Sequence, residues 1–191
     1  ERVHRIAERV KERRSLTVHH FTSKLELNRW KERIGEAYNK TFVDNWEFYP
    51  LTRREIEFTF NDLVLAANPR LIKVVLHEED IVGFIFGFPD VSRGLQRANG
   101  RLFPFGALHI LLDMRRTQWI SLNGVGIVPE YQGIGGNALL YSEMAKTVKG
   151  EFDFVHAELT QVAESAVQMR RDLVNLGAKP YKNHRVYRRA I

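Results

Sequence analysis

The 191-residue sequence contains no cysteine. This absence excludes disulfide bonds, thiolate metal ligands and a cysteine nucleophile, and it is compatible with a reducing compartment. No apolar run approaches the roughly 18 to 20 residues that span a bilayer, and no signal-peptide pattern opens the chain. We therefore expect a cytoplasmic protein with no membrane partner. His19, His20 and His77 lack a companion at metal-ligand spacing, so we also expect no metal site.

Acidic residues are outnumbered: 29 Lys and Arg against 23 Asp and Glu give a net charge of +6. Such a balance favours an anionic partner, which could be nucleic acid, a membrane surface or a phosphorylated cofactor, or it only keeps the protein soluble. The 44% apolar content is enough for a sizeable core in one α/β domain.

Hydrophobic periodicity and turn residues predict the order of the elements. We expect a strand over 15–21, a helix carrying Leu27 to Tyr38, a helix from the capping box Thr52–Glu55 to Ala67, a hairpin of 71–76 and 81–88, a strand over 119–128, a helix over 137–148, a strand over 154–159, a helix closed by Gly177 and a final strand over 181–191. Residues 1–14 are interpreted as a charged helix or linker from an absent upstream region, followed by a single domain over 15–191.

An insertion at about 89–118 interrupts this order. It is longer than most loops, and loops of this length are often functional. Phe103, Phe105 and Leu108 make it too apolar for a solvated loop, so it should pack on the core, on a partner or on a ligand.

The most informative segment is a glycine-rich turn between a strand and a helix. Gly133, Gly135 and Gly136 let the backbone adopt conformations closed to other residues and approach a ligand closely. The N–H groups at the start of the following helix are unpaired, and the helix dipole favours negative charge there. The pattern predicts an anion site that suits a pyrophosphate.

Residues 127–140, Ile-Val-Pro-Glu-Tyr-Gln-Gly-Ile-Gly-Gly-Asn-Ala-Leu-Leu, resemble motif A of the GNAT (GCN5-related N-acetyltransferase) superfamily, with Gln132 and Gly135 in the Gln/Arg-x-x-Gly-x-Gly/Ala pattern. The element order agrees with that superfamily over nearly all of 15–191. The resemblance implies a mixed, mostly antiparallel sheet flanked by helices, of the α/β (α+β) class. The opening also resembles the second half of larger bacterial proteins with two GNAT-like halves.

The same resemblance implies acetyl-CoA or another acyl-CoA as cofactor, with its pyrophosphate on the turn and its pantetheine arm along the preceding strand. The implied cofactor residues are Ile127, Val128, Gln132, Gly133, Ile134, Gly135, Gly136, Asn137 and Ala138. Asn137 departs from the family pattern, which has Gly or Ala there. The family's acid tyrosine, four residues before the glycine that closes the last helix, is replaced by Leu173.

The resemblance implies direct attack of an amine on the thioester, which needs a base and an acid. We predict Glu158 as the base, because strand alternation groups it with His156 and Thr160 at the expected site. Tyr181 and His184 are the candidate acids.

The leading hypothesis is an acyl-CoA-dependent N-acyltransferase of unknown acceptor. The alternative is a catalytically degenerate GNAT-like module for binding or assembly, in contact with an absent upstream half or a second copy. A third reading, nucleic-acid binding, is not expected, because CoA phosphates account for the charge equally well. The residues that favour it are Lys179, Lys182, Arg185, Arg188 and Arg189, with Tyr181 and Tyr187 between them.

Overall fold

The computed structural model describes residues 2–45, 48–185 and 187–189. Contacts between residues divide the chain into two units, 1–160 and 161–191, which are described separately below. Within the described residues, none of the helices combines the length and the apolar character needed to cross a bilayer.

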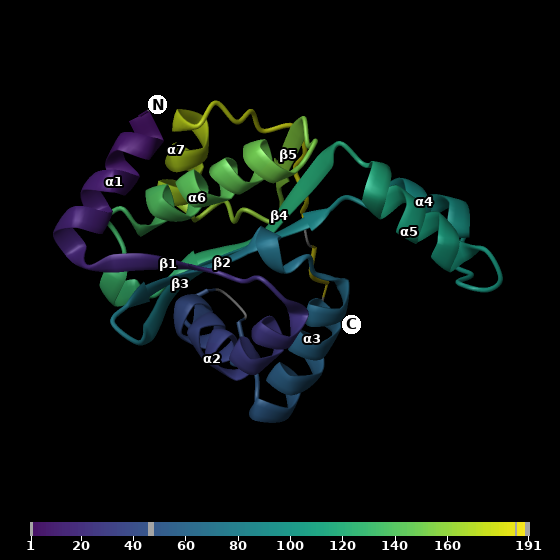
Figure 1. Cartoon of the computed structure of the whole chain (residues 1–191), viewed down its shortest axis with the longest axis horizontal. Coiled ribbons are helices and arrows are strands. Elements are labelled where there is room, and N and C mark those ends of the chain that lie inside the picture. Colours follow the sequence, from purple (N-terminus) through teal and green to yellow (C-terminus); the bar gives the residue numbers. More distant parts are fainter. Residues whose placement is uncertain (1, 46–47, 186, 190–191) are drawn as a thin grey trace. The chain divides into compact units, whose positions relative to one another are not determined.

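A five-stranded sheet forms the centre of the first unit (Figure 1). Its strands, in spatial as well as chain order, are β1 (Leu16–His20), β2 (Ile72–His77), β3 (Asp80–Pro89), β4 (Trp119–Ile127) and β5 (His156–Leu159). The first four pair antiparallel, while β4 and β5 pair parallel. The mostly antiparallel mixed sheet predicted from the sequence is therefore confirmed.

Helices cover both faces of this sheet. On one face lie α2 (Lys24–Phe42) and α3 (Arg53–Ala66), whose apolar side chains join Phe84 and Phe86 of β3 in the core. The other face carries α6 (Gly136–Glu151), with Leu139 and Leu140 fully buried. Helix α1 (Arg2–Arg14) packs beside α6.

The predicted capping box is confirmed at the start of α3. The side chain of Thr52 accepts a hydrogen bond from the Glu55 N–H, and Glu55 Oε2 accepts from the Thr52 N–H at 2.8 Å. The bonds that the Glu55 carboxylate accepts from the N–H and from the hydroxyl of Thr52 lower the pKa of this carboxyl. A short 3₁₀ turn, Pro69–Leu71, then leads into β2.

A partly buried cluster of charges joins α1 and α6 to the sheet. Glu143 of α6, with a side chain only 8% exposed, lies 2.9 Å from the ammonium groups of both Lys11 and Lys146. Its second oxygen is 3.4 Å from Nε2 of His20, whose Nδ1 is 3.0 Å from Nζ of the buried Lys73. The ion pairs lower the pKa of Glu143 against the opposing effect of burial.

This cluster predicts an acid-sensitive fold. Burial, followed by the neighbouring Lys73, lowers the pKa of His20 below its ordinary value of 6.5. The unfolded chain therefore takes up the proton first, and the stability associated with this histidine is present above pH 6.5 and is lost as the pH falls through its folded pKa. We expect the melting temperature of the unaltered chain to fall on acidification below pH 6.5, and that of His20→Gln to fall by a smaller amount. An equal fall in the melting temperatures of the two proteins would contradict this prediction.

The predicted insertion contains two helices, α4 (Ser92–Ala98) and α5 (Gly106–Arg116). Leu102, Phe103 and Phe105 connect them and are exposed. This apolar connection therefore does not pack on the domain core, which was one of the three alternatives expected for it.

The second unit, 161–191, contains α7 (Val167–Asn175), and Gly177 after it has a positive φ of 88° as expected for a helix-closing glycine. The predicted final strand over 181–191 is wrong for the described residues 181–185 and 187–189, which form no strand. A strand needs a neighbouring strand that completes its hydrogen bonds, and none is paired with these residues. Residues 186, 190 and 191 of that prediction lie outside the described residues.

Candidate functional site

The two parallel strands at the end of the sheet separate halfway along β4. Their pairing runs from Trp119↔His156 to Leu122↔Leu159, and a longer bond from the Thr160 N–H to the Leu122 carbonyl, 3.4 Å, follows it. Beyond this point β4 continues to Ile127 in register with β3 alone. Among the described residues, β4 therefore has no strand partner on its β5 side beyond Leu122, and we refer to this edge of β4 as the opening.

Backbone groups of β4 face this opening. The Val128 N–H donates to the Val82 carbonyl of β3 at 2.9 Å, so alternation turns the polar groups of Val125 and Ile127 away from β3. The Gln132 side chain donates to the Ile127 carbonyl at 3.1 Å, which confirms that direction. An extended chain with amide groups could therefore lie along β4 at Val125.

The glycine turn lies where β4 ends. A 3₁₀ turn, Pro129–Tyr131, is followed by Gly133 and Gly135, whose φ angles of 75° and 97° are left-handed. Helix α6 then begins at Gly136 with no side-chain cap and no acidic residue in its first turn. Its first N–H groups and its dipole are therefore directed at the space beside the turn, as an anion requires.

Close packing fixes the shape of this turn. A Cβ on Gly136 would lie 2.9 Å from Cδ1 of Ile127, and a Cβ on Gly135 would lie 2.5 Å from Cγ2 of Val10 in α1. By contrast, no heavy atom lies within 4 Å of a Cβ built on Gly133. Gly135 and Gly136 thus serve packing as well as backbone conformation, while Gly133 borders open space.

The remaining predicted cofactor residues surround the same point. Val128 and Ile127 are buried at the end of β4, Gln132 is exposed, and Ile134, Asn137 and Ala138 are half-buried. The structure therefore brings the whole predicted set together at the junction of β4 and α6. Asn137 lies in the first turn of the helix, so a role of its amide toward the anion stays a prediction.

A polar group stands at the point where β4 and β5 separate. Ser121 pairs with Glu158, and the hydroxyl of Thr160 donates to Oδ1 of Asn123. Asn123 is in register with Phe86, which places this group on the sheet face that α2 and α3 cover. Glu158 thus lies beside the opening, as predicted, and its role as base stays a prediction.

An aromatic stack continues the same face of the strands. The rings of Trp119 and His156 lie 4.4 Å apart at their centroids, two residues before Ser121 and Glu158 respectively. The grouping of His156 with Glu158 agrees with the alternation expected from the sequence. The pairing with Trp119 was not foreseen, because strand register cannot be read from sequence alone.

Tyr181 and His184, the candidate acids, belong to the second unit. Both are exposed, and the Lys182 ammonium lies 4.9 Å from the centroid of the Tyr181 ring. Their roles stay predictions. The contact of Val10 with the turn was missed by sequence reasoning, although the helical spacing of Val3, Ile6, Ala7 and Val10 already indicated an apolar face on α1.

Solved structures share this architecture. A possible acetyltransferase from Clostridium difficile 630 superposes with a TM-score of 0.59 at 12% identity, covering 92% of this chain and 98% of its own. A diaminobutyrate acetyltransferase from Paenibacillus lautus, solved with its substrate and coenzyme A, superposes with a TM-score of 0.53 at 14% identity. The match covers 84% of this chain and 74% of the Paenibacillus protein. The chain has the GNAT fold, which confirms the resemblance at the level of structure.

Two curated proteins are similar in sequence. Protein YghO of Escherichia coli K12 is 28% identical over 163 residues, which cover 83% of this chain and 42% of that protein. A bacterial ceramide synthase of Caulobacter vibrioides is 23% identical over 175 residues, covering 87% and 46%. The chain thus spans less than half the length of these relatives. No model of a protein family matches it.

Proposed function

We propose that this chain is an acyl-CoA-dependent N-acyltransferase. The observation that carries the proposal is the continuity between the opening beside β4 and the glycine turn at its end. One presents backbone groups to an extended amide-containing arm, and the other presents helix N–H groups to a pyrophosphate. The chemistry of coenzyme A, a pantetheine arm joined to a pyrophosphate, fits both in that order.

The reaction follows from where this arm would end. A thioester carried along β4 would reach the level of Ser121 and Glu158. An amine there attacks the thioester carbonyl, Glu158 accepts the amine proton, and the tetrahedral intermediate then expels the CoA thiolate, which must gain a proton. The products are an amide and CoA, and no covalent enzyme intermediate is needed.

For the acceptor we propose a long-chain amphipathic amine. The similarity to a protein named bacterial ceramide synthase supports this class, since a ceramide is the amide of a long-chain amino alcohol. The polar group of Ser121, Asn123 and Glu158 beside the Trp119–His156 stack offers both a hydrogen-bonding and an apolar surface to such a molecule.

Titration calorimetry with CoA and acetyl-CoA tests the cofactor site. Gly133→Asp should weaken binding at least tenfold, because it places a carboxylate beside the site of the pyrophosphate. Gly133→Asn is the matched control, since both residues tolerate a positive φ and differ mainly in charge. Gly135 is a poorer choice, because any side chain there also meets Val10.

Three outcomes of the calorimetry are distinguishable. Micromolar binding that Gly133→Asp weakens and Gly133→Asn preserves supports the cofactor site and justifies a screen of long-chain amines for CoA release. Equal binding by the two variants would place the pyrophosphate elsewhere. No binding by the unaltered chain would overturn the proposal in favour of the degenerate module.

A further inference from the structure

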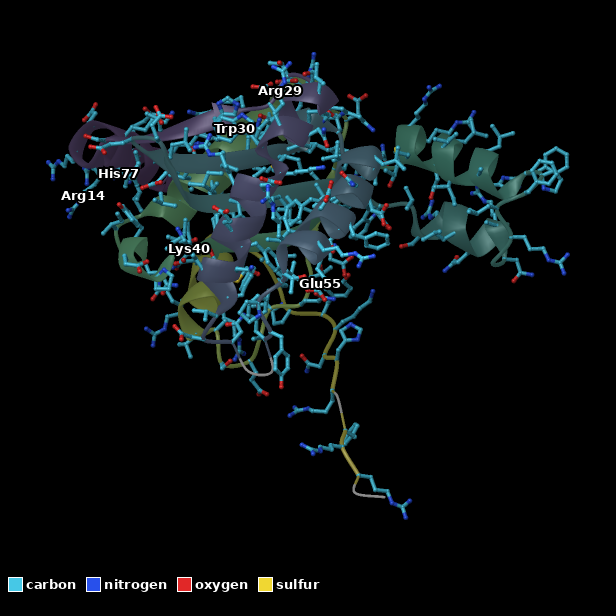
Figure 2. All side chains as sticks on the ribbon, turned by 90° about the horizontal axis from the view of Figure 1, so that it is seen from below. Arg14, Arg29, Trp30, Lys40, Glu55 and His77 are labelled. Carbon is cyan, nitrogen blue, oxygen red and sulfur yellow. The ribbon has the colours of Figure 1, made fainter. Side chains whose placement is uncertain are left out.

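The helical hairpin of α4 and α5 is a preformed projection. It extends from the ends of β3 and β4, away from the helices that cover the sheet, and both views show it standing apart from them (Figures 1 and 2). A Cβ on Gly94 of α4 would lie 2.9 Å from the His109 carbonyl oxygen and the Ile110 Cα of α5. The carboxylate of Asp113 accepts a hydrogen bond from the Gly94 N–H at 2.7 Å. The two helices are thus locked to each other.

The tip of this hairpin is apolar and uncovered. Leu102, Phe103 and Phe105 are 65%, 88% and 65% exposed. Leu108 and Leu111 continue the exposed apolar surface along α5. Isolated exposed apolar side chains are ordinary, but five on one short projection form a patch that needs a partner.

The exposed charges of the hairpin are all positive. Five arginines between residues 92 and 116 are exposed: Arg93, Arg97, Arg101, Arg115 and Arg116. The one acidic residue in that range, Asp113, is 8% exposed and is engaged with Gly94. The hairpin therefore presents an apolar tip with two exposed arginines beside it, Arg97 near the end of α4 and Arg101 in the connection. Arg93, Arg115 and Arg116 add positive charge at its base.

We propose that the hairpin is a docking surface for a membrane that contains anionic lipids. Aromatic and leucine side chains enter the boundary between headgroups and acyl chains, while arginines extend toward the phosphates. A second copy of the chain fits less well, since it would bring five further arginines to the same patch. This proposal departs from the sequence expectation of no membrane partner, which rested on the lack of a spanning segment.

The consequence for the reaction follows if the proposed function also holds. The hairpin and the opening beside β4 belong to the same unit and are joined through β4 itself. A membrane-bound hairpin would hold the site near the layer in which long-chain amines dissolve. The surface interaction itself does not require catalysis and can be tested without it.

Co-sedimentation with vesicles of phosphatidylcholine and phosphatidylglycerol tests the apolar tip. The triple variant Leu102→Ser, Phe103→Ser, Phe105→Ser should bind at least tenfold more weakly than the unaltered chain. The matched control is Leu25→Ser, Phe58→Ser, Leu65→Ser, which removes equally exposed side chains from α2 and α3. The tip variants leave Gly94, Gly106 and Asp113 intact, so circular dichroism should be unchanged.

The charges are tested separately with Arg97→Gln, Arg101→Gln. Each arginine near an anionic surface contributes roughly fivefold, so we expect about 25-fold weaker binding for the pair. Arg29→Gln, Arg54→Gln on α2 and α3 is the control, and Figure 2 shows Arg29 outside the hairpin.

Several results would overturn the proposal. These are no binding to anionic vesicles, equal binding to pure phosphatidylcholine, or tip variants that bind as well as the unaltered chain. A tip variant that converts a dimer to a monomer in light scattering would assign the patch to a second copy instead. Calorimetry with CoA on the tip variant keeps the two proposals apart, because the cofactor site should be unaffected.

Discussion

Glu158→Gln is expected to lower the rate of acyl transfer by roughly 10²- to 10⁴-fold, the usual contribution of a positioned general base. Glutamine keeps the size of the side chain and its place opposite Ser121, but it cannot accept the proton of the attacking amine. Binding of the acyl-CoA should be unchanged, because the proposed cofactor site lies along β4 and the turn rather than at Glu158. Single-turnover release of CoA, measured beside calorimetric titration, separates the two quantities.

The separation of rate from binding sharpens this test, because a merely structural change would weaken the binding of acyl-CoA as well as the rate. Glu57→Gln on α3, an exposed carboxylate away from the opening, is the control and should keep full activity. A Glu158→Gln protein with more than a tenth of the original rate would remove Glu158 from the role of base.

Glu143→Leu is expected to destabilise the fold by about 2 kcal/mol, because it removes the carboxylate shared by the cations of this cluster; the partial exposure of Lys11 and Lys146 keeps the loss below that of a fully buried pair. For a chain of this length, such a change lowers the melting temperature by about 4 to 8 °C. Lys11 would lose its ion-pair partner, and Lys73, whose pKa burial lowers, would lose one of two compensating carboxylates and keep Glu151. Thermal unfolding at pH 7 measures the effect.

Two further variants locate its cause. Glu8→Gln removes only the outer partner of Lys146, a pair exposed on both sides, and should cost less than about 1 kcal/mol. Glu143→Gln keeps the shape of the side chain but not its charge. Its loss of stability should lie between those of Glu8→Gln and Glu143→Leu. If the Glu143→Leu protein is as stable as the unaltered chain, the prediction is wrong, and the lysine side chains are solvated by water without the carboxylate.

Local chemistry made much of this fold predictable. The capping box at Thr52, the glycine after α7 and the turn at Gly133 each act within a few residues, so their signals are complete in the sequence. The grouping of His156 with Glu158 followed from strand alternation. The predicted cofactor residues lie together because they are nearly continuous in the chain; their role stays a prediction.

Features that depend on distant partners were not predictable in the same way. The charge cluster joins Lys11 to Glu143, 132 positions away, and nothing local announces that pairing. In the insertion, Gly94 and Gly106 permit close packing at α4 and α5, and this packing depends on partners that the local sequence does not reveal. The expected strand over 181–191 is wrong for its described residues, because a strand forms only where a neighbouring strand pairs with it.

The early separation of β5 from β4 exposes the protein to aggregation when no ligand lies along β4. The edge of β4 beyond Leu122, where only β3 lies alongside it among the described strands, is a template onto which a strand of another molecule can be added, the usual start of edge-to-edge aggregation. In the proposed complex a pantetheine arm would occupy that edge. If the proposal holds, CoA in the buffer should therefore suppress self-association of the chain.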